Sequence, residues 1–185
     1  EIEPEVVHAN QTIGDRRRID PLAQDRVTLT INDARSALAL TKKRYDLVIS
    51  QPSHPWTVAA SNLYTREFFE EVERHLTDDG VLIQWMGLGF LDGFLAKSLV
   101  ATLLEVFPHV RVYQPGLGAI LLLASPAPLD IESRAAEAIG REQETFAALG
   151  IFTPEDLGAT LVLDEAASRR FAQGASINRD DRNFL

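Results

Sequence analysis

Segment 45–50, Tyr-Asp-Leu-Val-Ile-Ser, decides the fold, together with the loop that follows it, Gln51-Pro-Ser-His-Pro-Trp56. A short apolar run that stops at a polar loop punctuated by proline is typical of a buried parallel strand. In open α/β sheets, ligands bind at the carboxyl ends of such strands. The sequence therefore predicts that the loop beginning at Gln51 lies at a ligand site.

The order of the other segments extends this strand into a doubly wound sheet. The alternating, β-branched segment 26–32 predicts a strand, and Asp33 is placed to begin a helix over 34–40. Apolar residues recur at helical spacing in 65–76, with Thr65 as the helix cap. The sequence predicts a strand over 81–85 and a long helix over 91–107. Two further strands, 110–113 and 119–124, are predicted to form a hairpin. This alternation predicts an α/β, Rossmann-like sheet with an antiparallel last strand.

Composition restricts the class of protein. The chain has 185 residues and a formal net charge of -9, which argues against non-specific binding to nucleic acid. The acidity suits a cationic substrate, and it equally suits a solvated acidic surface. The chain has no cysteine, and its four histidines lack the spacing of metal ligands, so we expect no metal. No signal peptide or membrane-spanning run is visible, which predicts a cytoplasmic domain without direct membrane insertion.

Five segments resemble the spermidine/spermine synthase family, the polyamine aminopropyltransferases, in the form of its divergent bacterial members. They are 26–35, 46–55, 62–69, 79–85 and 178–182. The family is built on the class I S-adenosylmethionine-dependent methyltransferase fold. The resemblance therefore implies a transferase whose cosubstrate is S-adenosylmethionine or its decarboxylated form. Its partner would be a small-molecule amine or another nucleophile, and the family usually dimerises.

The resemblance also implies a domain organisation. Residues 1–125 would form the methyltransferase-like domain without its first strand and its glycine-rich loop, which family members carry just before the position of Glu1. Residues 126–185, with helices predicted over 130–149 and 164–173, would form a helical appendage of that domain. Because the chain begins with Glu1 inside an element already under way, we expect a piece of a longer protein.

The resemblance assigns the nucleoside to three residues. Glu1 would bind the ribose hydroxyls, since a carboxylate offers two acceptors to a vicinal diol; its alternative is a solvated acidic terminus. Asp33 would accept from the adenine amino group while the backbone N–H of Ala34 reaches a ring nitrogen. The alternative for Asp33 is a helix cap, and both roles can coexist.

The acceptor side of the site departs from the family pattern. Gln51 occupies the position of the aspartate that deprotonates the amine, and His54 occupies that of a second aspartate. His54 is either a substitute base, with a usual pKa of about 6.5, or a surface residue. Tyr64 matches an aromatic residue that flanks the substrate, or it packs at the entry of a helix. Trp56 would line the same cavity or cover the end of the sheet.

These departures leave three functions open. The chain is a catalytic transferase, a module that binds the nucleoside without making polyamines, or a structural domain of a larger protein. The segment 178–182, Asn-Arg-Asp-Asp-Arg, either approaches the mouth of the site or forms structural ion pairs. Gln51 and His54 argue against ordinary spermidine synthesis, whereas Asp33 and Tyr64 favour ligand binding.

Overall fold

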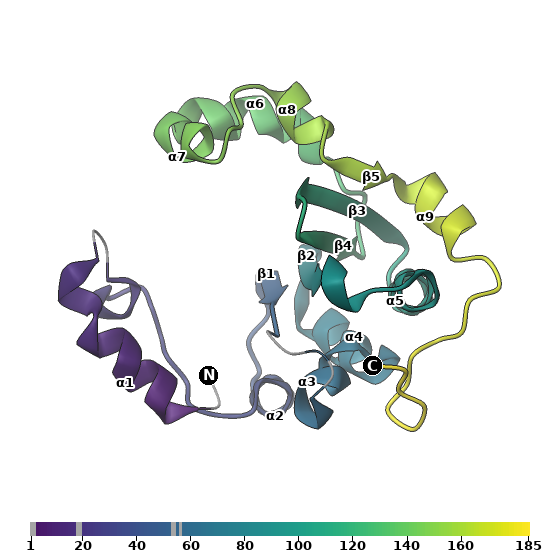
Figure 1. The fold of residues 1–185 in the computed structure, drawn as a ribbon, viewed down its shortest axis with the longest axis horizontal. Coiled ribbons are helices and arrows are strands. Elements are labelled where there is room, and N and C mark those ends of the chain that lie inside the picture. The colour runs from purple at the N-terminus through teal and green to yellow at the C-terminus, as the bar shows by residue number, and fades with distance from the viewer. Residues whose placement is uncertain (1–2, 18–19, 53–54, 56) are drawn as a thin grey trace. The chain divides into compact units, whose positions relative to one another are not determined.

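The structure is a computed structural model that describes residues 3–17, 20–52, 55 and 57–185. The chain divides into two compact units, unit 1 with residues 1–42 and unit 2 with residues 43–185. Figure 1 draws unit 1 in purple and blue and unit 2 in the colours that follow along the chain.

Unit 1 consists of short helices joined by irregular backbone. Its elements are α1 (Pro4–Thr12), η1 (Gly14–Arg16), η2 (Pro21–Ala23) and α2 (Ala34–Leu40). Helix α1 begins at Pro4. Proline has no backbone N–H, so this position adds no unpaired donor to the first turn. Asp33 caps α2, because its Oδ2 accepts from the backbone N–H of Ser36 at 2.8 Å. The prediction that Asp33 begins a helix over 34–40 is confirmed.

The prediction of a strand over 26–32 is wrong for this structure. The segment pairs in a sheet with no other described residue. Its alternating apolar side chains remain partly exposed, at 40% for Val27, 44% for Leu29 and 46% for Ile31. A strand needs the backbone groups of a neighbouring strand, and the described part of unit 1 provides none. Local alternation alone therefore did not decide this element.

Unit 2 is built on one mixed sheet of five strands in the order β1-β2-β4-β3-β5. The strands are β1 (Tyr45–Ser50), β2 (Leu76–Gly87), β3 (His109–Gly116), β4 (Ala119–Ser125) and β5 (Leu161–Leu163). Strands β1 and β2 are parallel, β4 is antiparallel to both β2 and β3, and β5 is antiparallel to β3. The β3–β4 hairpin and the antiparallel finish agree with the sequence.

Helices connect the parallel strands and cover the sheet (Figure 1). They are α3 (Val58–Ser61), α4 (Arg66–His75), α5 (Gly93–Val106), α6 (Ile131–Arg141), α7 (Gln143–Ala148), α8 (Pro154–Gly158) and α9 (Glu165–Phe171), with short turns η3 (Asn62–Tyr64) and η4 (Leu88–Phe90). Helix α4 contacts α5, and α5 contacts α9, so the three form a continuous layer. Helix α4 begins after its predicted cap, Thr65, and buries Phe68, Phe69 and Val72.

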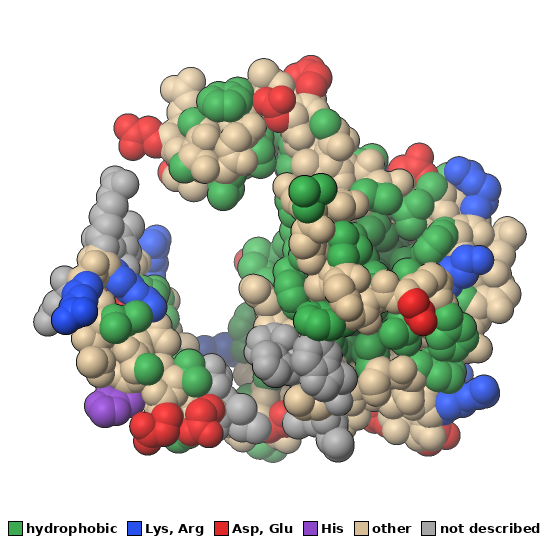
Figure 2. All heavy atoms as spheres, viewed as in Figure 1, with side chains coloured by type: hydrophobic (Ala, Val, Ile, Leu, Met, Phe, Trp, Pro, Cys, Tyr) green, Lys and Arg blue, Asp and Glu red, His purple; other side chains and the backbone are tan. Residues whose placement is uncertain are grey.

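The two faces of the sheet differ in burial. On one face Leu82 of β2 lies opposite Ala124 of β4, and both are 0% exposed. On the other face, Tyr113 and Leu123 form a smaller core with Leu129, which precedes α6, because neighbouring residues of a strand point to opposite faces. Hydrophobic side chains also reach the surface of unit 2 over β3, β4 and α5 (Figure 2).

Strand β1 is less buried than its apolar sequence predicts. Leu47 and Ile49 are 48% and 62% exposed. The physical reason is that β1 lies at the edge of the sheet and pairs only with β2 among the described residues. The strand and its parallel pairing are therefore confirmed, and its full burial is not.

Residues 126–185 contain a strand that the sequence did not indicate. Strand β5 pairs with β3 through Leu163 opposite Val112 and Leu161 opposite Tyr113. Three residues are too few to show the alternation by which a strand is recognised. The predicted helices of this region are present, with the first divided at Glu142 into α6 and α7.

Candidate active site

The carboxyl ends of β1 and β2 meet at one edge of the sheet. The strands are parallel, and their register places Ser50, the last residue of β1, opposite Gln84. Gln51 follows directly and is exposed. The described structure thus places Gln51 where the sequence predicted it, at the carboxyl end of a parallel strand.

Gln84 joins the two strand ends from inside the core. Its side chain is 0% exposed, and its Nε2 donates to the carbonyl of Ser50 at 3.4 Å and to that of Trp85 at 3.3 Å. Its Oε1 has no hydrogen-bond partner among the described residues. A buried polar side chain costs free energy unless it is paired, and here the paired half of the amide holds the residue just before Gln51.

Tyr64 is a buried donor beside this amide. It is 0% exposed, and its hydroxyl donates to the carbonyl of Trp85 at 3.1 Å. Burial raises the pKa of Tyr64, and the nearby Gln84 side chain only partly offsets that effect. The phenol therefore stays protonated at neutral pH, so it donates a hydrogen bond and does not accept a proton. The packing of Tyr64 at the entry of α4 is visible here, and its contact with a substrate stays a prediction.

The segment near the end of the chain holds Tyr64 in place. Asn178 is 1% exposed, and its Nδ2 donates to the carbonyl of Tyr64 at 3.0 Å. Its own backbone carbonyl accepts from the N–H of Arg66 at 2.9 Å. Asp180 also has a structural contact, since its Oδ1 accepts from the hydroxyl of Thr65 at 2.7 Å. The segment 178–182 thus secures the first turn of α4.

The other predicted members of the site do not belong to the described part of unit 2. Asp33 and Ala34 belong to unit 1, whereas Gln51 and Tyr64 belong to unit 2. Hydrogen bonds from Ser36 lower the pKa of the Asp33 carboxyl below its usual value, so it is ionised at neutral pH. Glu1, His54 and Trp56, for which the sequence made predictions, lie outside the described residues.

Sequence reasoning placed Gln51 and Tyr64, and put Gln84 at the rim of the pocket, but it did not indicate that Gln84 and Asn178 are buried. The signal for Gln84 was an amide inside an otherwise apolar strand, 81–85, where a polar residue needs a buried partner. Asn178 had no comparable local signal. No group of three or more His, Asp or Glu side chains suited to a metal ion occurs in the described part of the chain.

The strand order, the parallel β1–β2 pair and the antiparallel hairpin define a Rossmann-like α/β fold of methyltransferase type. The sequence pattern of the spermine/spermidine synthase domain matches residues 1–116. The chain belongs to this family. In the described residues, no helix is long and apolar enough to cross a membrane.

Known proteins agree with this assignment. The polyamine aminopropyltransferase of Lachnospira eligens is 33% identical over 95 residues, which are 50% of this chain and 33% of that protein. A probable spermidine synthase from Corynebacterium glutamicum has a TM-score of 0.66 and 27% identity over 100% of this chain and 63% of that one. A spermidine synthase in complex with the transition state analogue AdoDATO has a TM-score of 0.74 and 20% identity. That match covers 92% of this chain and 59% of the other. The chain thus spans about a third of the length of the matched Lachnospira protein.

Proposed function

We propose that the chain is a spermidine-synthase-like transferase domain that binds an adenosyl ligand, and that it does not carry out ordinary spermidine synthesis. The adenosyl ligand is S-adenosylmethionine, decarboxylated S-adenosylmethionine or methylthioadenosine. The observation that carries the proposal is Gln51, an exposed amide at the carboxyl end of β1 in a chain of this family.

The chemistry of aminopropyl transfer explains the importance of Gln51. An amine attacks the carbon next to a sulfonium, so the amine must first lose its proton and be held in line. Glutamine can hold an amine by a hydrogen bond but cannot take its proton. Tyr64 does not replace a base, since burial raises the pKa of its phenol. Without a general base the rate falls by about 10²- to 10⁴-fold.

Support for the adenosyl ligand comes from unit 1 and from a relative. Asp33 is ionised at neutral pH and stands at the first turn of α2, so it can accept from an amino group. The spermidine synthase bound to AdoDATO shares the fold of this chain. We therefore assign the adenine to Asp33 and the backbone N–H of Ala34, and the ribose to Glu1.

A second candidate is a domain that binds a ligand or a partner without catalysis. The burial of Tyr64 favours it, because a ring that is 0% exposed touches no substrate unless the site opens. For the catalytic alternative, the acceptor is a small amine or another nucleophile that does not depend on a base at Gln51.

We also propose that the protein forms a homodimer and that it acts without a metal.

Calorimetric titration of methylthioadenosine, S-adenosylmethionine and decarboxylated S-adenosylmethionine into the chain tests the ligand. We expect saturable binding, and Asp33→Ala should weaken it at least about tenfold, since a hydrogen bond to a charged group is lost. Asp33→Asn is the matched control, because asparagine also caps helices. If the folded Asp33→Ala variant binds as tightly as Asp33→Asn and the parent chain, the adenine assignment is wrong.

Aminopropyl transfer to putrescine tests the missing base. We expect negligible transfer by the parent chain, and we expect Gln51→Asp to raise the rate by about 10²-fold or more. Gln51→Asn, which changes the side chain but adds no base, is the control. Comparable transfer by the parent chain and Gln51→Asp would overturn the proposal that Gln51 prevents spermidine synthesis.

A further inference from the structure

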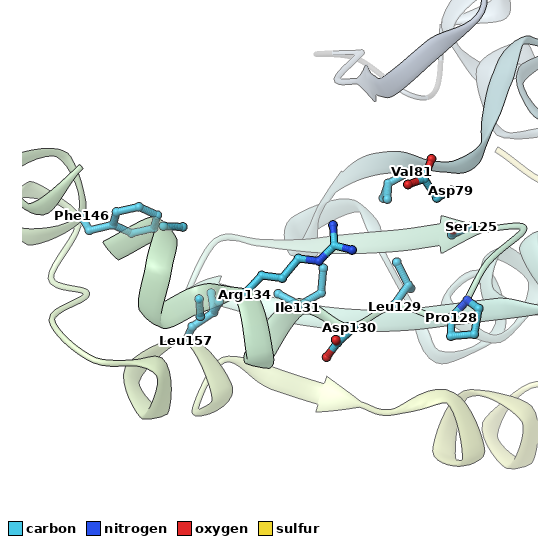
Figure 3. Close-up of a pocket in the computed structure, with 12 residues that line it drawn as sticks. Asp79, Val81, Ser125, Pro128, Leu129, Asp130, Ile131, Arg134, Phe146 and Leu157 are labelled. Carbon is cyan, nitrogen blue, oxygen red and sulfur yellow. The ribbon is translucent and has the colours of Figure 1, made fainter. Parts of the chain in front are cut away.

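A cavity lies in unit 2, away from the candidate active site. It has a volume of about 330 Å³ and lies between the start of β2, the segment after β4 and the helices α6, α7 and α8. Its wall is mainly apolar and includes Val81, Leu129, Ile131, Phe146 and Leu157 (Figure 3). Strand β2 reaches this cavity at Asp79 and Val81 and reaches the candidate active site at Gln84, so the two sites lie toward opposite ends of one strand.

Three charged residues, Arg134, Asp79 and Asp130, line the cavity, and the opposite charges of Arg134 and Asp79 belong to different elements, α6 and β2. Arg134 extends from α6 across the cavity toward the Asp79–Val81 part of β2 (Figure 3). Within the described residues, the side chains of Arg134 and Asp79 make no hydrogen bond or ion pair. Both acidic residues of the same helix have other partners, since Glu132 pairs with Arg111 at 2.7 Å and Glu137 with Arg141 at 3.9 Å. Arg134 and Asp79 thus remain available to groups of opposite charge.

We propose that this cavity binds a zwitterionic small molecule with a large apolar group, of the chemical class of an apolar α-amino acid. The Arg134 guanidinium matches a carboxylate, which it can hold through two parallel N–H donors. Asp79 accepts from the ammonium group, and the apolar side chain displaces water from the wall formed by Leu129, Ile131 and Phe146.

Size and charge together favour this ligand class. A volume of about 330 Å³ is at the small end of ligand cavities, which run from about 300 to 1,000 Å³. A purely apolar ligand would pair with neither Arg134 nor Asp79. A simple anion would pair with Arg134 but would be repelled by Asp79, and a simple cation would pair with Asp79 but would be repelled by Arg134. A zwitterion satisfies both. This site is independent of the proposed adenosyl site.

Titration of the chain with L-phenylalanine, followed by calorimetry, tests the proposal against two analogues. One is 3-phenylpropionate, which lacks the ammonium group, and the other is 2-phenylethylamine, which lacks the carboxylate. We expect each analogue to bind at least about tenfold more weakly, because each loses one charge-assisted interaction. Arg134→Gln should remove the preference over 2-phenylethylamine, and Asp79→Asn should remove the preference over 3-phenylpropionate.

Asp130→Asn is the matched control, since Asp130 also lines the cavity but its carboxylate points away from the Arg134 side chain (Figure 3). This variant should bind L-phenylalanine as the parent chain does. Arg134 and Asp79 are exposed, so the variants should remain folded, which circular dichroism verifies. The proposal is overturned if the folded chain does not bind L-phenylalanine, if the two analogues bind as tightly as L-phenylalanine, or if Arg134→Gln leaves the affinity for L-phenylalanine unchanged.

Discussion

At the residue scale, Asn178 stabilises the candidate site through four hydrogen bonds. It donates to the carbonyl of Tyr64 and to the hydroxyl of Thr102, and it accepts from the N–H groups of Arg66 and Phe184. The side chain supplies two of these contacts, to Tyr64 and Phe184. Both polar atoms of this buried side-chain amide therefore have a partner, which makes the residue sensitive to small changes.

We expect Asn178→Ala to lower the free energy of unfolding by about 2 kcal/mol or more, because it leaves the Tyr64 carbonyl and the Phe184 N–H without their partner. Chemical denaturation measures the change. Asn183→Ala, directly after the segment 178–182 and less buried, should cost less. Equal losses in the two variants would contradict a special role for Asn178.

Glu132 gives the stability of unit 2 a dependence on pH. Burial favours a higher pKa for Glu132, but hydrogen bonds from Arg111, at 2.7 and 2.8 Å, outweigh it and lower the pKa below its usual value. A carboxyl with a depressed pKa in the folded state stabilises the fold above its unfolded pKa, near 4.5. That stabilisation is lost as the pH falls through the folded pKa.

We therefore expect Glu132→Gln to lower the free energy of unfolding at pH 7 by about 1 to 2 kcal/mol, and to lower it less at pH 3. Denaturation curves at both pH values give the comparison. Glu137→Gln is the control on the same helix, since its contact with Arg141 is 3.9 Å long and largely exposed. A deficit of the same size at both pH values would show that the charge of Glu132 does not contribute.

At the element scale, aspartates cap helices in both units. Asp33, Asp92 and Asp164 each accept from a backbone N–H in the first turn of α2, α5 and α9. Asp92 matters most to the sheet of unit 2, because α5 is the 14-residue connection between β2 and β3 and buries six of its residues. Its cap bond, from the N–H of Leu95, is 2.8 Å long.

We expect Asp92→Ala to lower the free energy of unfolding by about 1 kcal/mol, since the first turn of α5 loses a hydrogen-bond acceptor. Asp92→Asn should cost much less, because asparagine caps a helix about as well. Thermal melts followed by circular dichroism compare them. If the two variants lose the same stability, the charge or another contact of Asp92, and not the cap, is responsible.

At the scale of the whole molecule, the two units differ in how much they bury. Unit 2 contains the sheet and its cores, whereas Gly14 is the only buried residue among those described in unit 1. Regions with few buried apolar contacts open locally at a low free energy. The stability of the chain should therefore be concentrated in unit 2.

We expect the amides of α1 and α2 to exchange with solvent at least about a hundredfold faster than those of β2 and β4. Hydrogen exchange on the intact chain, read by mass spectrometry, resolves the two units. The amides of α5, a helix inside unit 2, serve as the internal control and should be protected like the strands. Equal protection of both units would mean that they open as one cooperative body.

The sequence by itself determined the features that depend on neighbours in the chain. The caps Asp33 and Thr65, the helical spacing of Phe68, Phe69 and Val72, and the parallel strand before Gln51 are all local patterns, and each appears in the structure. The motifs that resemble aminopropyltransferases are local as well, which is why they indicated the family that residues 1–116 match.

Tertiary structure alone decided the features that depend on partners distant in the chain. Asn178 and Tyr64 are separated by 114 positions, and three-residue β5 exists only because β3 lies beside it. The segment 26–32 has the alternation of a strand but no described partner, so it remains unpaired. Helices form from bonds within a segment, whereas strands and buried amides require backbone groups that folding brings from elsewhere.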